Sequence, residues 1–455
     1  MKKLGGGGRM HRKTRRIQRH ARRLSGHWRV RLIFWLGAVA VGVLAAVFAS
    51  GALFADRLFA SGVERWPWLP FVLTPLGLGL VAWLTARFVP QAQGSGIPQT
   101  IAALRSPPGC RLRESLLHIK VGLSKIVLTL LGLACGASVG CGGPAAHMGA
   151  TVMYGLGRLA RFPGYYLNRG LIAAGGAAGV AAAFNAPLAG VMFAIEELSR
   201  AYDRRMGLVV LVPVILAGVA ALLLFGNRDY FVAVDARLDD LAESWPVILG
   251  CGVLGGACGG LFARALLAGC RFMAPLQRKI PVRVALVCGL LLALIGLASD
   301  GGVYGTGHRE AQAILSGEGP VDPLYPLWKL LATLASVLSG IPGGLFAPSF
   351  SVGAGFGAAM GEIFTSVPLT AVALLGMAGY FSGVVQTPVT AFVIVMETTN
   401  SQELMIPLMV TSLLAAGVSR LICPRPIYVV MAVGVTALFE ARGENAGPQG
   451  AQRKT

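Results

Sequence analysis

The sequence predicts an all-α, polytopic membrane protein whose two halves are related to each other. Three observations lead to this: the chain is poor in charge, it contains long uncharged runs, and two of its segments repeat one pattern. Of its 455 residues, 55% are hydrophobic, 13% are charged and 62 are glycines, whereas soluble chains average about 25% charged residues. This composition excludes a soluble globular enzyme, a disordered protein and an ordinary DNA-binding domain.

The first 31 residues carry much of the positive charge. They hold 12 of the 40 Lys and Arg residues and no acid, so the net charge of +20 falls to +8 over the rest of the chain. The positive-inside rule places this segment in the cytoplasm, against anionic headgroups. An arginine-rich arm for nucleic acid is the alternative, but no reading module follows, and we expect no nucleic-acid partner. A cleaved signal peptide is disfavoured because the next uncharged run, 24 residues long, exceeds a signal core.

Ten runs without formal charge follow along the chain, and a helix needs about 20 apolar residues to cross a bilayer. The runs are residues 32–55, 66–86, 126–157, 170–195, 206–227, 244–263, 284–299, 330–361, 363–396 and 404–419. Hydropathy at this density predicts a multi-pass protein with no separate soluble domain. We expect it in the plasma (inner) membrane of a prokaryote, with both termini in the cytoplasm.

Three of these runs are longer than one crossing and contain helix-breaking prolines, namely Pro144, Pro342, Pro348 and Pro388. Broken helices at membrane depth are tolerated only where protein or a water-filled cavity receives the freed backbone groups. Interrupted apolar segments therefore indicate a transporter or channel site.

Two segments repeat one pattern. Residues 184–196 read FNAPLAGVMFAIE and residues 385–397 read VQTPVTAFVIVME, each with a proline nine residues before a glutamate. A glycine-rich turn ending in proline lies 43 residues before the first of these prolines and 40 before the second. Related halves commonly place a substrate site at their shared interface. We expect a basic tail over 1–31, a first membrane repeat over 32–227, a second over 228–440 and a polar tail over 441–455.

Ionisable residues at membrane depth are costly and are read as functional by default. Glu196 and Glu197 end one run, Glu397 ends another, and Glu362 separates two. For Glu397 and Glu362 a second interpretation stays open, in which they lie in the interface or cap helices.

The remaining reactive residue types indicate packing. The eight cysteines form no C-x-x-C pair and no histidine stands at metal-ligand spacing, so we expect neither a metal nor a cofactor. Buried free cysteines behave as small hydrophobes. Lys120 and Lys125 flank the start of the third run and are expected to snorkel to the interface.

Three turns share a design that suits an anion. They are Gly94-Ser-Gly-Ile-Pro98, Gly140-Cys-Gly-Gly-Pro144 and Gly344-Leu-Phe-Ala-Pro348, and each opens a helix-like segment. Glycine lets the backbone approach a ligand, proline fits the first helical turn, and amides at a helix start bind anions. No Asp or Glu occurs over residues 115–195, so a pore lined there favours an anion over a cation. Three such helix starts meeting at one point would hold an anion without a full charge, which permits rapid release.

These motifs resemble the CLC chloride channels and chloride/proton antiporters. GSGIP at 94–98, GxxGP at 140–144, GLFAP at 344–348, the NAPLAG stretch from Asn185 that leads to Glu196 and Glu197, and the late Tyr428 agree in order and spacing over about residues 33–440. The resemblance implies two inverted-topology repeats with tilted, broken helices. It also implies a homodimer in the lipid bilayer, with one pore per subunit.

The resemblance also implies the site. Chloride would be held by the hydroxyls of Ser95 and Tyr428 and by the amides of Leu345 and Phe346. The amides of Gly94 and Ser95 would shape the inner part of the site, and Gly96 and Ile97 are further anion-binding residues of the same turn. The turn over Cys141, Gly142 and Gly143 would form the outer part. Ser95 is the residue type associated with chloride in this family, and bromide and nitrate remain further candidate anions.

One departure from the family pattern decides the expected mechanism. The family usually reads G-R-E-G-P at the second turn, and its glutamate gates the pore and carries protons, whereas this chain has Cys141 and Gly142. Glycine can do neither. Glu197 matches the inner proton glutamate of the family, but without an outer stage it is expected to be structural. The sequence therefore predicts passive, uncoupled chloride conduction, and no enzyme and no catalytic residue.

Two alternatives stay open. The first is a proton-coupled antiporter that uses another outer group, either His147 or an acid from a distant loop. The second is an intramembrane serine hydrolase built on Ser95. A nucleophile elbow requires G-x-S-x-G, whereas residues 93–97 read QGSGI, so this alternative is remote.

Overall fold

The computed structural model describes the backbone over residues 7–160, 169–199, 204–226, 230–231, 233–234, 236, 238, 241–317, 322–364 and 367–441. Within these ranges the ordered elements are helices. The polar tail that the sequence predicts over 441–455 lies outside them, apart from its first residue. The residues of the basic segment from Gly7 onward belong to the first helix, Gly7–Arg65.

The described residues of the first half form eleven elements in chain order. They are α1 (Gly7–Arg65), α2 (Leu69–Phe88), η1 (Pro90–Ala92), α3 (Ile97–Arg105), α4 (Arg111–Leu116), α5 (Ile119–Ala134), α6 (Gly142–Leu159), α7 (Leu171–Phe184), α8 (Pro187–Phe193), η3 (Ala194–Ser199) and α9 (Arg204–Phe225). Four of these elements, α2, η1, α3 and α8, have a proline at their first or second position, where the missing amide donor costs nothing.

The second half runs from α10 to α18. Its elements are α10 (Leu241–Lys279), α11 (Pro281–Ala298), α12 (His308–Ser316), α13 (Tyr325–Leu338), α14 (Phe346–Ile363), α15 (Leu369–Val385), α16 (Pro388–Thr398), η4 (Gln402–Leu404), α17 (Met405–Ile422) and α18 (Ile427–Ala441). The described helices include five that are long and apolar enough to cross a membrane, and six shorter apolar ones.

The long uncharged runs are broken where the sequence predicts. Residues 126–157 divide between α5 and α6, residues 330–361 between α13 and α14, and residues 363–396 fall mainly in α15 and α16. The breaks carry glycine-rich turns, and Gly136 and Gly340 each stand at the end of a helix with positive φ, a conformation that favours glycine.

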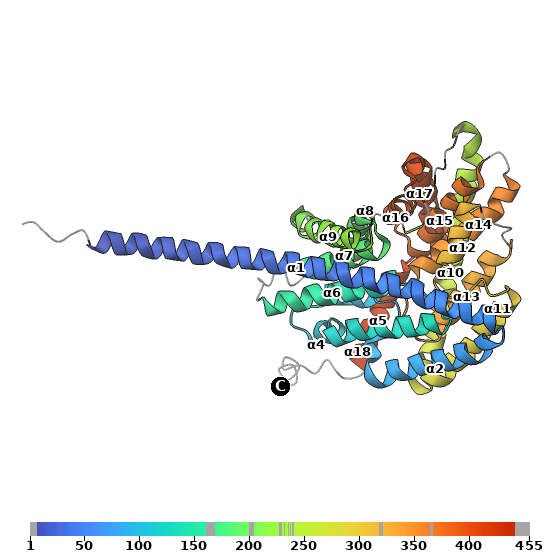
Figure 1. Ribbon diagram of the computed structural model, residues 1–455, viewed down its shortest axis with the longest axis horizontal. Helices are drawn as coiled ribbons and strands as arrows, with labels where there is room; N and C mark the ends of the chain where they lie inside the picture. Colours follow the sequence, from blue (N-terminus) through green and yellow to red (C-terminus); the bar gives the residue numbers. More distant parts are fainter. Residues whose placement is uncertain are drawn as a thin grey trace, which may run out of the picture.

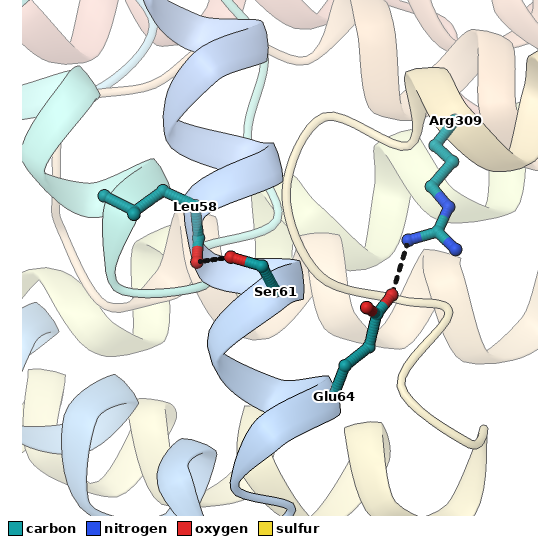
Figure 2. A network of polar contacts seen from close by, with 4 residues as sticks. All are labelled: Leu58, Ser61, Glu64 and Arg309. Atoms are coloured by element: carbon teal, nitrogen blue, oxygen red, sulfur yellow. Dashed lines mark hydrogen bonds and ion pairs between the residues drawn. The ribbon is translucent and has the colours of Figure 1, made fainter.

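The helices of each half mostly gather together, and α2 of the first half also packs on α11 of the second. In Figure 1, α5, α6, α7 and α9 gather beside α1, which extends from the body as one long helix, while α10, α14, α15 and α17 form the other side. The last helix, α18, returns to the first half and packs on α3. The end of α1 is tied to α12 by an exposed ion pair of Glu64 and Arg309, 3.3 Å (Figure 2).

The repeat is visible in detail at two matching corners. Asn185 ends α7 and Gln386 ends α15, and both adopt left-handed backbone, with φ of 50° and 61°. After each corner a proline opens a short helix, α8 or α16, and these two helices pack on each other.

A glutamate that follows or ends each of these two helices caps the start of the other helix. Glu397, at the end of α16, accepts hydrogen bonds from the first amides of α8, those of Leu188 (3.0 Å) and Ala189 (2.8 Å). Glu196, beyond the end of α8, accepts from the amides of Val389 (3.2 Å) and Thr390 (2.7 Å) at the start of α16. A carboxylate at a helix start satisfies its unpaired amides and complements its dipole. Both glutamates therefore cap helices, one of the two interpretations that the sequence left open for Glu397.

Candidate anion pathway

The three glycine-rich turns meet at the centre of the molecule. Gly140 and Gly344 exchange both backbone hydrogen bonds, with N–O distances of 2.8 Å and 2.7 Å. The Gly343 amide donates to the carbonyl of Gly94 at 3.4 Å, and Gly94 pairs with Pro342 in a short bridge. Segments about 250 residues apart in the chain (94 and 343) are thereby fixed against one another at a single point.

A helix begins at each of these turns. α3 starts at Ile97, α6 at Gly142 and α14 at Phe346, and α18 starts nearby at Ile427. The first amides of a helix have no acceptor within the helix and carry partial positive charge. The predicted site residues from Gly94 to Ile97, from Cys141 to Gly143, and Leu345 with Phe346 thus stand at helix starts that converge.

Two hydroxyl groups lie at this convergence without good partners. Tyr428 is completely buried and Ser95 is 4% exposed. The two hydroxyls are close enough to interact with each other. Neither hydroxyl oxygen has a hydrogen-bond partner of good geometry. A buried hydroxyl without a partner costs free energy, so both are suited to donate to a ligand. Ser95 Oγ also lies against Gly143, where a methyl group would overlap it.

At position 142 an aromatic ring fills the space of a side chain. A Cβ on Gly142 would lie 2.6 Å from Cε2 of Phe184 and 3.4 Å from Cδ2 of Phe346. The two rings are stacked, with centroids 6.1 Å apart, and Phe184 also meets Phe350 and Tyr230 edge-on. Within the described residues, no carboxylate stands at this point.

Cys141 is buried beside these rings. Its thiol and the Tyr230 hydroxyl are close enough to interact. Tyr230 and Phe231 in turn pack on the imidazole of His308, at centroid distances of 4.8 Å and 5.2 Å. Aromatic contacts of this kind rigidify their surroundings, so the second turn is held from both sides.

Glu197 is the residue that the sequence matches to an inner proton glutamate. It belongs to η3, a π-helical segment, is 1% exposed, and acts electrostatically on Tyr428. Such π-helical turns occur frequently at functional sites. Its neighbour Glu196 is anchored to α16, which fixes the direction of the segment.

The structure places Lys125, Lys120 and His147 in different surroundings. Lys125 does not snorkel: it is completely buried, and its Nζ donates to the Gly94 carbonyl at 3.1 Å. Lys120 is exposed. His147 is buried, its Nε2 lies 3.0 Å from the carbonyl oxygen of Leu116, and its Cβ faces Gly96. The imidazole therefore lies behind the first turn and not beside position 142.

Two contributors were missed by sequence reasoning: Phe184 beside Gly142, and Lys125 as a hydrogen-bond donor to the first turn. Neither contact has a signal in the local sequence. Among the described residues, no group of three or more His, Cys, Asp or Glu side chains could hold a metal.

Comparisons with known proteins agree on one family. Residues 77–420 match the family described as voltage gated chloride channel. The H(+)/Cl(-) exchange transporter ClcA of Vibrio vulnificus (strain YJ016) is 30% identical over 381 residues, 79% of each chain. ClcA of Vibrio cholerae serotype O1 (strain ATCC 39315) is 30% identical over 422 residues, covering 85% of this chain and 86% of the relative.

Solved structures show the same fold. A slow cyanobacterial Cl-/H+ antiporter superposes with a TM-score of 0.78 at 26% identity, over 90% of this chain and 98% of its own. A CLC-type fluoride/proton antiporter gives 0.73 at 25% identity, over 88% and 97%. These likenesses agree with the predicted architecture of two inverted-topology repeats with broken helices.

Proposed function

The chain belongs to the voltage gated chloride channel family, and from this premise we propose that it is a passive, uncoupled conductor of chloride. Membership makes it a multi-pass membrane transport protein for anions, and not an enzyme. The observation that carries the proposal is Gly142, where the Phe184 ring takes the space of a gating side chain.

The proposed binding step uses groups that donate hydrogen bonds and no formal charge in direct contact. Chloride lies between the hydroxyls of Ser95 and Tyr428 and receives amides from Leu345 and Phe346. The converging starts of α3, α6 and α14 supply partial positive charge. A site without a full cation binds anions weakly enough to release them rapidly, which suits conduction.

The proposed direction of flux follows the gradient. A chloride ion crossing the membrane gains about 2.3 kcal/mol per 100 mV, and without a proton carrier at position 142 nothing links that energy to protons. Glu197 then has a structural role near Tyr428. We expect chloride to be preferred, with bromide and nitrate as tests of selectivity.

The experiment records chloride efflux and internal pH together in liposomes that contain the purified protein. We expect chloride efflux that follows the imposed potential without stoichiometric proton movement. Proton uptake against its own gradient, driven by a chloride gradient, would overturn the proposal. Liposomes without protein and a Tyr428→Ala variant are the controls for leak and for the assigned site.

Proton-coupled exchange is the second candidate, because the relatives in both comparisons are named as proton-linked exchangers. It requires another proton group in place of Gly142. His147 is poorly placed for this because its Nε2 is bound to Leu116 and it faces the first turn. The pH recording distinguishes this candidate from passive flux.

The assembly and topology are proposals too. We expect a homodimer with one pathway in each subunit, since every residue of the proposed site comes from one chain. We also expect both termini in the cytoplasm, so that α1 runs outward from the basic segment and position 142 faces the outer side.

A further inference from the structure

Nothing next to the Ser95 hydroxyl fixes its direction. Ser95 is 4% exposed, and its Oγ has no hydrogen-bond partner of good geometry. The residues on either side, Gly94 and Gly96, have φ of 76° and 103°, backbone conformations that glycine adopts at low cost. Because glycine moves readily between conformations, the local sequence leaves the direction of the hydroxyl open. The groups that orient Ser95 must therefore act on its two neighbours.

A relay of hydrogen bonds reaches the Gly96 side of this turn. The Gly96 amide donates to Oε1 of Gln99 at 3.0 Å, and Nε2 of Gln99 donates to the Gln93 carbonyl at 2.5 Å. Nε2 of Gln93 donates to Oε1 of Gln277 on α10 at 2.9 Å, and Nε2 of Gln277 donates to the carbonyl of Leu338, the last residue of α13, at 2.7 Å. This glutamine relay, formed by Gln99, Gln93 and Gln277, joins the Gly96 amide to the second half of the chain.

The fold makes room for the bond between Gln93 and Gln277. Gly340, just after the end of α13, has φ of 84°, and a Cβ at this position would lie 2.9 Å from Nε2 of Gln93 and 3.3 Å from Cδ of Gln277. Shortly after it, Pro342 pairs with Gly94 in a short bridge. The two glutamines therefore meet where the two halves join, beside the turn that carries Ser95.

The Gly94 side of the turn is held by other bonds. The Gly94 carbonyl accepts from Nζ of Lys125 at 3.1 Å and from the Gly343 amide at 3.4 Å. Residues of the second half therefore act on both neighbours of Ser95, Gly343 directly and Gln277 through the glutamine relay. Side-chain bonds in series strengthen one another in a buried environment, so a break at Gln277 is expected to loosen the whole relay.

We propose that Gln277 and Gln93 are positioning residues which, through Gln99, hold the Gly96 amide and so orient the Ser95 hydroxyl towards the anion. This inference rests on the proposed chloride site and adds two residues outside the contacts of the anion. A hydrogen bond weakens steeply when its donor is displaced or tilted. Chloride is a single acceptor atom, whereas nitrate offers three oxygens and can follow a displaced donor. The glutamine relay therefore sets both the affinity for chloride and the preference for chloride over nitrate.

The test measures chloride and nitrate binding by calorimetry on the purified full chain. Gln277→Met and Gln93→Met each remove the bond between the two glutamines and keep a side chain of similar length. We expect each variant to weaken chloride binding by about three- to tenfold and to lower the ratio of chloride to nitrate affinity by about threefold. The double variant should lose no more than either single variant, because all of them break one relay.

Thr411→Val is the matched control. It removes a buried hydroxyl that donates to the Ile248 carbonyl of α10 at 3.2 Å, a bond from α17 to α10 that is not part of the glutamine relay, so both affinities should stay unchanged. If Gln277→Met does not fold, Gln93→Met carries the test alone, since it leaves the bond from Gln277 to Leu338 in place.

Three results would overturn the inference: unchanged affinities in Gln93→Met, equal losses for chloride and nitrate, or losses that add up in the double variant. The last two would mean that the glutamines support the fold in general and do not orient Ser95. Proton-coupled chloride transport by the unmodified chain would instead overturn the proposed function. It would leave the role of the glutamine relay standing, because binding is measured without flux.

Discussion

Restoring a carboxylate at position 142 tests the proposed pathway most directly. In Gly142→Glu the new Cβ would lie 2.6 Å from Cε2 and 2.9 Å from Cζ of Phe184, whereas carbon atoms in contact lie about 3.5–4.0 Å apart. The Phe184 ring must therefore retreat by about 1 Å. It is completely buried among Phe346, Phe350 and Tyr230, and overpacking of this kind costs about 1–3 kcal/mol.

The same substitution should lower chloride flux. An ionised carboxylate at position 142 competes with chloride, so flux through Gly142→Glu should be low at pH 8 and increase as the residue is protonated, more steeply than in the unmodified chain. Gly142→Gln has nearly the same shape without the charge, so its flux should not depend on pH and should match that of the protonated glutamate variant. Liposome chloride efflux across the pH range, with thermal unfolding in detergent, measures both effects. If the glutamate and glutamine variants share the unmodified pH profile and rate, position 142 does not line the pathway.

Three further predictions concern the caps, the hydroxyl and the histidine. Glu397→Gln should lower thermal stability by about 1.5–3 kcal/mol, because charge-assisted bonds at 2.8 and 3.0 Å become neutral or are lost. The exposed Glu362→Gln should leave the stability unchanged, and equal melting curves for the two variants would contradict the prediction. Ser95→Ala should weaken chloride binding by about tenfold or more in calorimetry, and unchanged affinity would exclude its hydroxyl as a ligand. His147→Ala should leave the ratio of proton to chloride movement unchanged, although it loses a buried contact, and an altered ratio would restore it as a proton group.

Much of the architecture could be predicted because glycine and proline act locally. Pro187 and Pro388 fix where short helices begin, and the turns before Pro144 and Pro348 break the runs, whatever the rest of the chain does. Spacing could also predict that the halves are related. It could not predict that Gly140 pairs with Gly344, because backbone bonds between distant turns depend on how whole helices pack.

The site was harder to predict for the same reason. Nothing near Gly142 in the sequence indicates that the ring of Phe184 occupies its space. The expectation that Lys125 snorkels was wrong. Its position at the start of the third uncharged run suggested the membrane interface, whereas the tertiary fold supplies the Gly94 carbonyl as a buried acceptor. Local sequence preferences predict where a helix begins and ends, but they do not predict which residues pack against it.

The reciprocal caps made by Glu196 and Glu397 have a consequence for how this protein folds during synthesis. Each carboxylate caps a helix start in the other half, so the short helix of either half is uncapped until both halves are in the bilayer. Chains truncated after residue 227 should be recognised and degraded by the cell. Two complementary fragments, divided between α9 and α10 and expressed together, should supply each other's missing helix caps and form a conducting unit.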